Sequence, residues 1–143
     1  MTSKLREELN SGQYNRKEDC MEKEELILDT SSILFSLANG SDILDEIESA
    51  NEYYPIISNG VISELEKFAA SKTKLKPFAV VAINSIKKHK IRIDESKVYV
   101  DKWILELSKK KKYTVCTNDI KLKKKLRNMG IHTLSVTKTG TLR

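Results

Sequence analysis

Residues 25–31 constrain this chain most, because they read as a buried strand that ends at an acid and turns directly into a helix. The aliphatic run 26–28 shows no polar alternation, as expected of a strand covered on both faces of a parallel sheet. Asp29 follows without Gly or Pro, and Thr30 and Ser31 are good helix N-cap residues. Ligands of open α/β sheets bind beyond the carboxyl ends of the strands. Asp29 is therefore either a site residue or the cap of the next helix.

The rest of the chain alternates short apolar strands with helical patterns. Strands are predicted over 26–29, 54–58, 91–93, 113–117 and 131–136, and helices near 33–39, 42–50, 61–69, 77–90, 98–112 and 121–129. Pro55, near the start of the second strand, indicates an edge position or a strand beginning. This alternation predicts an α/β fold with a parallel sheet of four or five strands and helices on both faces.

Charge is distributed unevenly along the chain. Residues 1–70 carry 6 Lys/Arg against 15 Asp/Glu, whereas residues 71–143 carry 20 against 5. A basic half of this size predicts a polyanionic partner, nucleic acid before membrane, although solvated surface lysines would give the same count. No apolar run is long enough to span a bilayer, and Cys20 and Cys116 lack metal-ligand spacing. We therefore expect free thiols and a cytoplasmic location.

Four acids occupy the ends of predicted strands or the starts of predicted helices: Asp29, Glu64, Asp101 and Asp119. In a parallel sheet these positions share one edge, so we expect the four carboxylates to meet there. Each acid taken singly is adequately explained by helix capping or by the helix dipole. Their joint placement predicts a shared site.

Carboxylates gathered in one cleft repel one another and favour a hard cation such as Mg²⁺ or Mn²⁺. A cation held this way suits phosphodiester hydrolysis, because it lowers the pKa of a bound water and stabilises negative charge on phosphate. Thr117 and Asn118 either hydrogen-bond the acids or a metal-bound water, or simply form the turn. A basic helix follows Asp119 and is the candidate phosphate track; its cations are Lys121, Lys123, Lys124, Lys125 and Arg127.

Several other residues give weaker indications of function than the four acids. His89 and His132 have no partner at ligand spacing, and no Gly-rich phosphate loop is present, which disfavours an enzyme that uses a nucleotide cofactor. Tyr99 and Trp103 fall on the predicted helix 98–112, and we interpret both as packing residues rather than as a platform for base stacking.

With these residues in hand, the chain resembles the PIN-domain family of metal-dependent ribonucleases over residues 25–136. The resemblance rests on the opening motif 26–31, Ser63-Glu64-Leu65, Asp101 and Thr117-Asn118-Asp119. It implies a three-layer α/β/α sandwich, cleavage of single-stranded RNA with Mg²⁺ or Mn²⁺, and frequent homodimers. Lys102 after Asp101 departs from the family pattern, because many relatives carry a second acid or a small residue there.

The resemblance leaves two branches and a third reading open. The basic run after Asp119 is similar to the branch that processes ribosomal RNA precursors, whereas the compact size also fits VapC-type toxins held by an antitoxin partner. A catalytically inactive RNA-binding or ribosome-assembly module is the third reading. The domain is expected over 25–136, with a polar N-terminal tail over 1–24, disordered or helical, and a C-terminal tail over 137–143.

Overall fold

A five-stranded, all-parallel sheet forms the centre of the protein, in the strand order β3-β2-β1-β4-β5. The computed structural model describes residues 23–143. The strands are β1 (Glu24–Leu28), β2 (Tyr53–Ser58), β3 (Arg92–Asp94), β4 (Thr114–Cys116) and β5 (Thr133–Leu134). The helices of this part of the chain are α3 (Thr30–Ala38), α4 (Ile43–Ala50), α5 (Asn59–Ala69), α6 (Lys76–Lys88), α7 (Val100–Lys110) and α8 (Ile120–Asn128).

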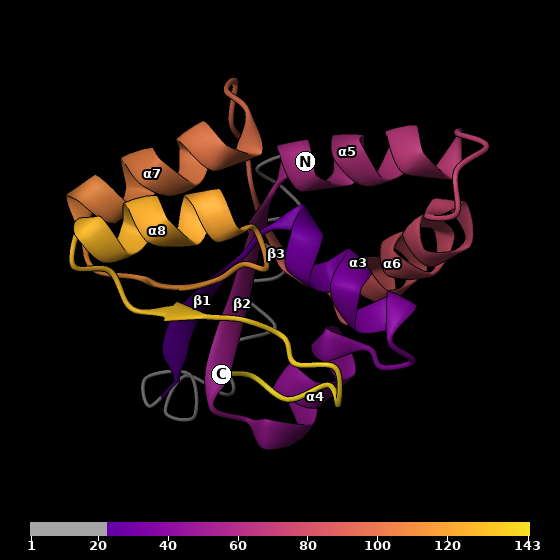
Figure 1. The fold of residues 1–143 in the computed structure, drawn as a ribbon, viewed down its shortest axis with the longest axis horizontal. Helices are drawn as coiled ribbons and strands as arrows, with labels where there is room; N and C mark the ends of the chain where they lie inside the picture. Colours follow the sequence, from indigo (N-terminus) through magenta and orange to yellow (C-terminus); the bar gives the residue numbers. More distant parts are fainter. Residues whose placement is uncertain (1–22) are drawn as a thin grey trace.

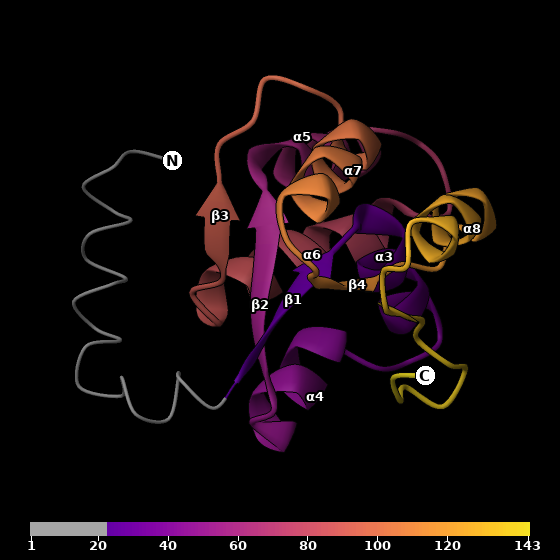
Figure 2. The same ribbon diagram turned by 90° about the vertical axis from the view of Figure 1, so that its left-hand side faces the viewer.

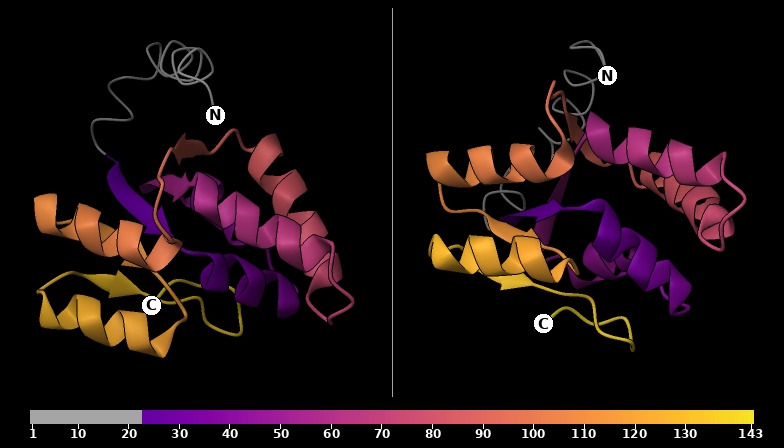
Figure 3. Two further views of the ribbon diagram at one scale, coloured as in Figure 1. Left: turned by 90° about the horizontal axis from the view of Figure 1, so that it is seen from above. Right: turned by 45° about the horizontal axis from the view of Figure 1, so that its top comes forward.

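The sheet is wound in two directions, which divides the helices between its faces. From β1 the chain moves outward through β2 to β3, and it then returns past β1 to β4 and β5. Right-handed crossovers therefore place α3 to α6 on one face and α7 and α8 on the other. Figure 3 shows these two helical layers on either side of the sheet. The predicted α/β class and three-layer sandwich are confirmed.

Strand β1 lies at the middle of the sheet, and its last three residues are fully buried. It pairs with β2 on one side and with β4 on the other. Leu26, Ile27 and Leu28 are at most 1% exposed, as their unbroken apolar run predicts. The helices bury aliphatic stripes against the sheet, among them Leu65 of α5, Ile104 of α7 and Leu126 of α8. Figure 1 shows β1 passing through the centre of the molecule.

The structure corrects two details of the sequence prediction. Strand β2 is interior, between β3 and β1, so the edge position suggested by Pro55 is wrong. Pro55 is instead the third residue of β2, and pairing with β3 begins only at Ile56, which is consistent with the other expectation, a strand beginning. The last strand is also shorter than the predicted 131–136, because only Thr133–Leu134 pair with β4.

Residues 137–143 fold back along the end of the sheet. Val136 forms an antiparallel bridge with Leu142, and the Arg143 amide donates to the Ser135 carbonyl at 2.9 Å. Gly140 makes the reversal at φ +88°, and a Cβ there would lie 2.3 Å from Ser41 Oγ. Glycine is therefore required on both conformational and steric grounds.

The N-terminal tail expected over 1–24 lies almost wholly outside the described residues. Figure 2 shows the described part of the chain from a second direction. Across residues 23–143, none of the helices combines the length and the apolar character needed to cross a bilayer.

Candidate metal site at the carboxyl edge of the sheet

The carboxyl ends of β1 and β4 form the point where the direction of winding reverses. In open α/β sheets this switch point is the usual ligand site, because the two chain segments leaving it diverge to opposite faces. Asp29 follows β1, and Thr117, Asn118 and Asp119 follow β4. The first turns of α3, α5, α7 and α8 converge at this edge (Figure 3). Helix N-termini carry partial positive charge, so the edge favours anionic groups.

Asp29 is the most buried of the four acids, at 4% exposure. Its Oδ1 caps α3 by accepting from the Ser32 amide at 3.1 Å, and it also accepts from Ser31 Oγ at 2.7 Å. Its Oδ2 accepts from Thr117 Oγ1 at 2.5 Å. Three donors thus fix the orientation of this carboxylate. Asp29 can both cap α3 and belong to the site, because the chain passes directly from β1 into α3 and the same side chain lies at the strand end and at the helix start.

Glu64 reaches the edge from the second turn of α5. Thr30 Oγ1 donates to Glu64 Oε1 at 3.2 Å, which ties α5 to the start of α3. The start of α5 also lies close to that of α7, because a Cβ at Gly60 would stand 3.1 Å from Val100 Cγ2. Only a residue without a side chain allows this approach without a shift of its neighbours. Close packing of α5 on α7 brings Glu64 toward the first turn of α7.

Asp119 caps α8, and its Oδ1 accepts from the amides of Lys121 and Leu122 at 2.9 and 3.1 Å. The Thr117 hydroxyl connects the two strand ends, because it donates to Asp29 and accepts from the Asp119 amide at 3.0 Å. Asn118 points elsewhere: its side chain exchanges hydrogen bonds with the backbone of Val136 at 2.9 and 3.0 Å. Thr117 therefore supports the acids, whereas the Asn118 side chain secures the C-terminal segment.

Ser31 adds a second link between the two strand ends. Its hydroxyl donates to Asp29 Oδ1 and accepts from the Asn118 amide at 3.1 Å. We also expected Thr30 and Ser31, like Thr117 and Asn118, to support the acids; Thr30, Ser31 and Thr117 each hydrogen-bond an acid, and the Asn118 side chain does not.

Asp101 stands in the first turn of α7 and is exposed. Within residues 23–143, no group donates a hydrogen bond to its carboxylate. Partial burial of the carboxylate raises the pKa of Asp101 most, the charge of Asp119 raises it further, and Lys125 lowers it. Asp101 in turn raises the pKa of Asp29 and that of Glu64.

The electrostatics show a set of acids that disfavour one another's ionisation. The pKa of Asp29 is raised, chiefly because burial desolvates the carboxylate, and the hydrogen bonds from Thr117, Ser31 and the Ser32 amide offset this only in part. The pKa of Glu64 is raised by burial and then by the charges of Asp101 and Asp29, against the hydrogen bond from Thr30. The four acids therefore belong to one electrostatic neighbourhood.

The cations of α8 differ in their availability. Lys123 Nζ donates to Ser135 Oγ at 2.7 Å, and Arg127 Nε donates to Thr133 Oγ1 at 3.2 Å. These two side chains therefore lie along β5. Lys121, Lys124 and Lys125 are exposed, and the positive charge of Lys125 acts to lower the pKa of Asp101, against the larger effect of burial. Arg127 is exposed as well but is tied to Thr133, so the freest part of the predicted phosphate track consists of these three lysines.

Comparison with known proteins identifies the family. The family model described as "PIN like domain" matches residues 26–138. The chain belongs to the PIN-like domain family. Its structure is similar to one described as "Structure of the PIN domain endonuclease Utp24", with a TM-score of 0.68 and 28% identity, covering 83% of this chain and 89% of that one.

A second solved structure shares the PIN-like fold. It is described as a domain of a functionally unknown protein from Methanocaldococcus jannaschii DSM 2661, with a TM-score of 0.57 and 16% identity over 80% of this chain and 91% of that one. No curated protein matches the sequence.

The donor set of this PIN-like domain fits a hard divalent cation. Within the described residues, Asp119 Oδ2, Glu64 Oε2 and both oxygens of Asp101 receive no hydrogen bond from the protein, and carboxylate oxygens are the ligands of Mg²⁺ and Mn²⁺. The four acids do not form a cage, because no three of them have ligand atoms all within 4.8 Å of one another in this part of the chain. Such spacing suits an ion that retains several waters and contacts one or two carboxylates directly.

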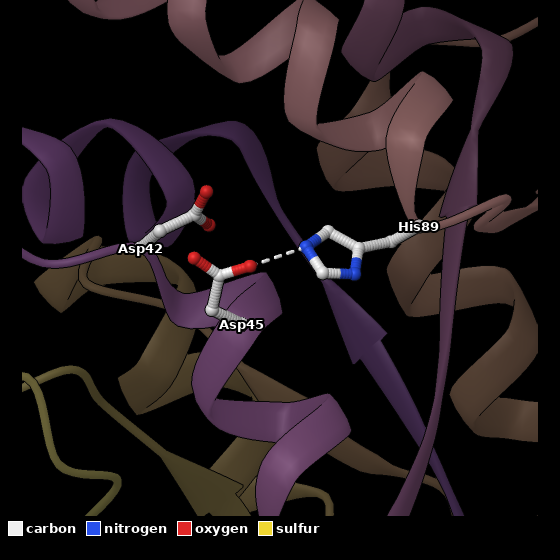
Figure 4. Close-up of side chains that lie close together, drawn as sticks. All are labelled: Asp42, Asp45 and His89. Carbon is white, nitrogen blue, oxygen red and sulfur yellow. Dashed lines mark hydrogen bonds and ion pairs between the residues drawn. The ribbon is translucent and has the colours of Figure 1, made fainter.

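A different group does have ligand atoms within 4.8 Å of one another: Asp42, the N-cap residue of α4, Asp45 in the first turn of α4, and His89, the C-cap residue of α6 (Figure 4). Its ligand atoms are already paired. Asp42 caps α4 and accepts from Ser85 Oγ at 2.6 Å, and His89 contacts Asp45 at 2.5 Å and also Glu48. Because α6 ends just before β3 begins, this group lies near the amino ends of the strands. It links α4 to α6, away from the four acids.

Sequence reasoning missed Ser58 and Ile120 at the carboxyl edge and misjudged Tyr99. Ser58 ends β2 at the level of Asp29; it is fully buried, and its hydroxyl has no hydrogen-bond partner among the described residues. Its position at a strand end, like that of Asp29, was the available signal. Tyr99 and Ile120 are 87% and 82% exposed. The interpretation of Tyr99 as a packing residue is therefore wrong, whereas Trp103, 5% exposed, packs in the core as expected.

Proposed function

We propose that this PIN-like domain is an endoribonuclease that hydrolyses phosphodiester bonds with Mg²⁺ or Mn²⁺. The observation that carries the proposal is the gathering of Asp29, Glu64, Asp101 and Asp119 from four separate elements at the switch point of the sheet. Burial and mutual repulsion raise the pKa of three of them, and a bound cation would offset that cost. Similarity to a PIN domain endonuclease supports the same chemistry.

The protein's own groups have separable roles in this proposal. The four carboxylates would hold the ion, one or two of them directly and the others through its waters, and the bound ion would supply charge that acidifies water and stabilises the phosphate. Thr117 and Ser31 hold the Asp29 carboxylate in one orientation, so its oxygens need no reordering when a cation enters. Lys121, Lys124 and Lys125 bind the phosphates that flank the cleaved bond.

RNA is the proposed substrate because the exposed lysines of α8 begin at the acids. The sequence of this helix is similar to that of the PIN branch that processes ribosomal RNA precursors, and we propose that class of RNA before a toxin's target. Similarity to a PIN domain endonuclease over 83% of the chain supports an endonuclease rather than an inactive binding module.

A cleavage assay tests the proposal. The purified chain should cut a single-stranded oligoribonucleotide internally when Mg²⁺ or Mn²⁺ is present, and EDTA should stop the reaction. Glu64→Gln should abolish cleavage, because it removes one carboxylate charge with little change of shape. Glu66→Gln, an exposed position on the same helix, is the matched control and should cleave like the parent. Equal loss in both variants, or metal-independent cleavage, would refute the proposal.

Salt dependence tests the role of α8 separately. Each phosphate contact contributes about 0.7 to the slope of log affinity against log salt for single strands. Replacing Lys121 and Lys124 by Gln should therefore reduce the slope by about 1.4 in a binding titration between 50 and 200 mM salt. Lys109 and Lys110, at the far end of α7, form a control pair whose replacement should leave the slope unchanged. An unaltered slope in the α8 variant would leave its lysines as solvated surface residues.

A further inference from the structure

Two exposed apolar side chains flank the acids. Tyr99 is the N-cap residue of α7, two positions before Asp101, and Ile120 is the first residue of α8, directly after Asp119. Within residues 23–143, only four large hydrophobic side chains are exposed, and these are two of them. The other two, Val80 and Val81, lie in the middle of α6. A ligand that carries apolar surface next to a negatively charged group would cover both side chains while it binds at the acids.

The backbone under both side chains is firmly held. The Ser96 amide donates to Asn59 Oδ1 at 2.7 Å and the Val98 amide to Ser96 Oγ at 3.2 Å, which secures the loop before Tyr99. The Tyr99 carbonyl accepts from the Trp103 amide at 2.9 Å. Ile120 follows a residue that caps α8 with two hydrogen bonds. The backbone that carries the two side chains is therefore ordered before a ligand arrives, so binding has to order only the side chains themselves.

Helices α7 and α8 lie side by side with their first turns at the same edge (Figure 1). Besides partial burial, the charge of Asp119 raises the pKa of Asp101, as expected if the two acids beside Tyr99 and Ile120 lie close in space. A strand of nucleic acid whose phosphate lies at the acids would present one base toward α7 and the next toward α8. The exposed lysines of α8 attract the backbone of such a strand, which selects nucleic acid over a neutral apolar ligand.

We propose that Tyr99 and Ile120 hold the two unstacked bases that flank the phosphate at the acidic site, Tyr99 by stacking and Ile120 by apolar contact. They are positioning residues that restrict the substrate to unpaired nucleotides, because bases in a duplex are stacked on their neighbours and present no free faces. The inference rests on the proposed function for its substrate, RNA. It adds two residues that do not belong to the acidic site itself.

Binding in the absence of cleavage tests the inference. The probe is a single-stranded oligoribonucleotide of 12 nucleotides with a fluorescent label, titrated with the full chain in EDTA and again in Ca²⁺. Stacking of a base on an aromatic side chain corresponds to roughly 5- to 150-fold in affinity by alanine substitution. Tyr99→Ala should weaken binding by about tenfold, and Ile120→Ala by a few-fold. Tyr99→Phe keeps the ring and should bind within about twofold of the parent.

Three controls separate stacking from other causes. The double change Val80→Ala and Val81→Ala removes the other two exposed large apolar side chains of the described residues, which lie on α6, and should leave binding unchanged. An oligonucleotide with abasic sites should bind the parent and Tyr99→Ala equally. The same RNA annealed into a duplex should also show no effect of Tyr99→Ala.

The inference is overturned if Tyr99→Ala and Ile120→Ala bind the single strand like the parent, which would assign these side chains to a protein partner or to solvent. An equal loss on the abasic probe, or no binding by the parent in either condition, would also overturn it. Its failure is distinct from failure of the proposed function. Cleavage in Mn²⁺ that is lost in Glu64→Gln but retained in Tyr99→Ala at parental affinity rejects only the stacking role.

Discussion

Asp29→Asn should lower RNA cleavage at least about 100-fold while leaving the fold intact. Mutating a residue that only hydrogen-bonds a metal ligand lowers metal affinity or activity about 10- to 100-fold. Asp29 is proposed to be a metal ligand itself, so its loss should cost at least as much. Asn retains Oδ1 for the Ser32 amide and is as good an N-cap as Asp, so α3 keeps its start. Single-turnover cleavage of a labelled oligonucleotide in Mn²⁺, with circular dichroism as the check on folding, measures both effects.

The same variant should become more stable relative to the parent as pH rises in the absence of metal. The pKa of Asp29 is raised in the folded state, so its carboxyl stabilises the fold below its ordinary pKa and loses that contribution as pH rises through the folded value. Asn does not titrate. Urea denaturation in EDTA from pH 4 to pH 8 should show the difference in unfolding free energy shifting in favour of Asp29→Asn. A difference that stays constant with pH would contradict the raised pKa.

Thr117→Val should destabilise the protein by about 2–4 kcal/mol, because it removes a buried hydroxyl that serves two partners. Valine keeps the shape but leaves Asp29 Oδ2 without a donor and the Asp119 amide without an acceptor. Thr117 is fully buried, so water does not replace either partner. The pKa of Asp29 should rise further, and cleavage should require a higher pH or more metal.

Thr117→Ser is the matched variant for this position. It keeps the hydroxyl and loses one methyl group, which costs about 1 kcal/mol. Urea denaturation of both variants in EDTA separates the hydrogen bonds from packing. Equal stability of the two variants would mean that the hydroxyl contributes nothing beyond its volume.

The sequence predicted the fold well because its strongest signals are local. The run 26–28 is apolar throughout since β1 lies between two strands and two helical layers, and burial on both faces leaves no polar alternation. Pro55 suggested an edge strand wrongly. Proline lacks an amide hydrogen, and this is tolerated in an interior strand too, at a position where pairing with the neighbouring strand has not yet begun. The pairing partner of a strand is a tertiary property that a single proline does not report.

The acids were predictable from position alone, whereas their supporting contacts were not. Parallel topology sends every strand end to one edge, so Asp29 and Asp119 had to approach each other. Which neighbour faces them depends on side-chain direction: Thr117 turns toward Asp29, and Asn118 turns toward Val136. Tyr99 was misjudged because helical periodicity was extended to residue 98, whereas α7 begins at Val100 and leaves Tyr99 outside its buried stripe.

Melting temperature as a function of Mn²⁺ concentration, measured for the parent and three variants, tests the central claim most directly. Because the gathered acids exist only in the folded state, millimolar Mn²⁺ should raise the melting temperature of the parent by several degrees. Asp29→Asn should lose this rise, whereas Glu66→Gln and Asp45→Asn, the latter removing a member of the group near the amino ends of the strands, should keep it. A parent that ignores Mn²⁺, or a rise that survives in Asp29→Asn and disappears in Asp45→Asn, would contradict a metal site at the four acids.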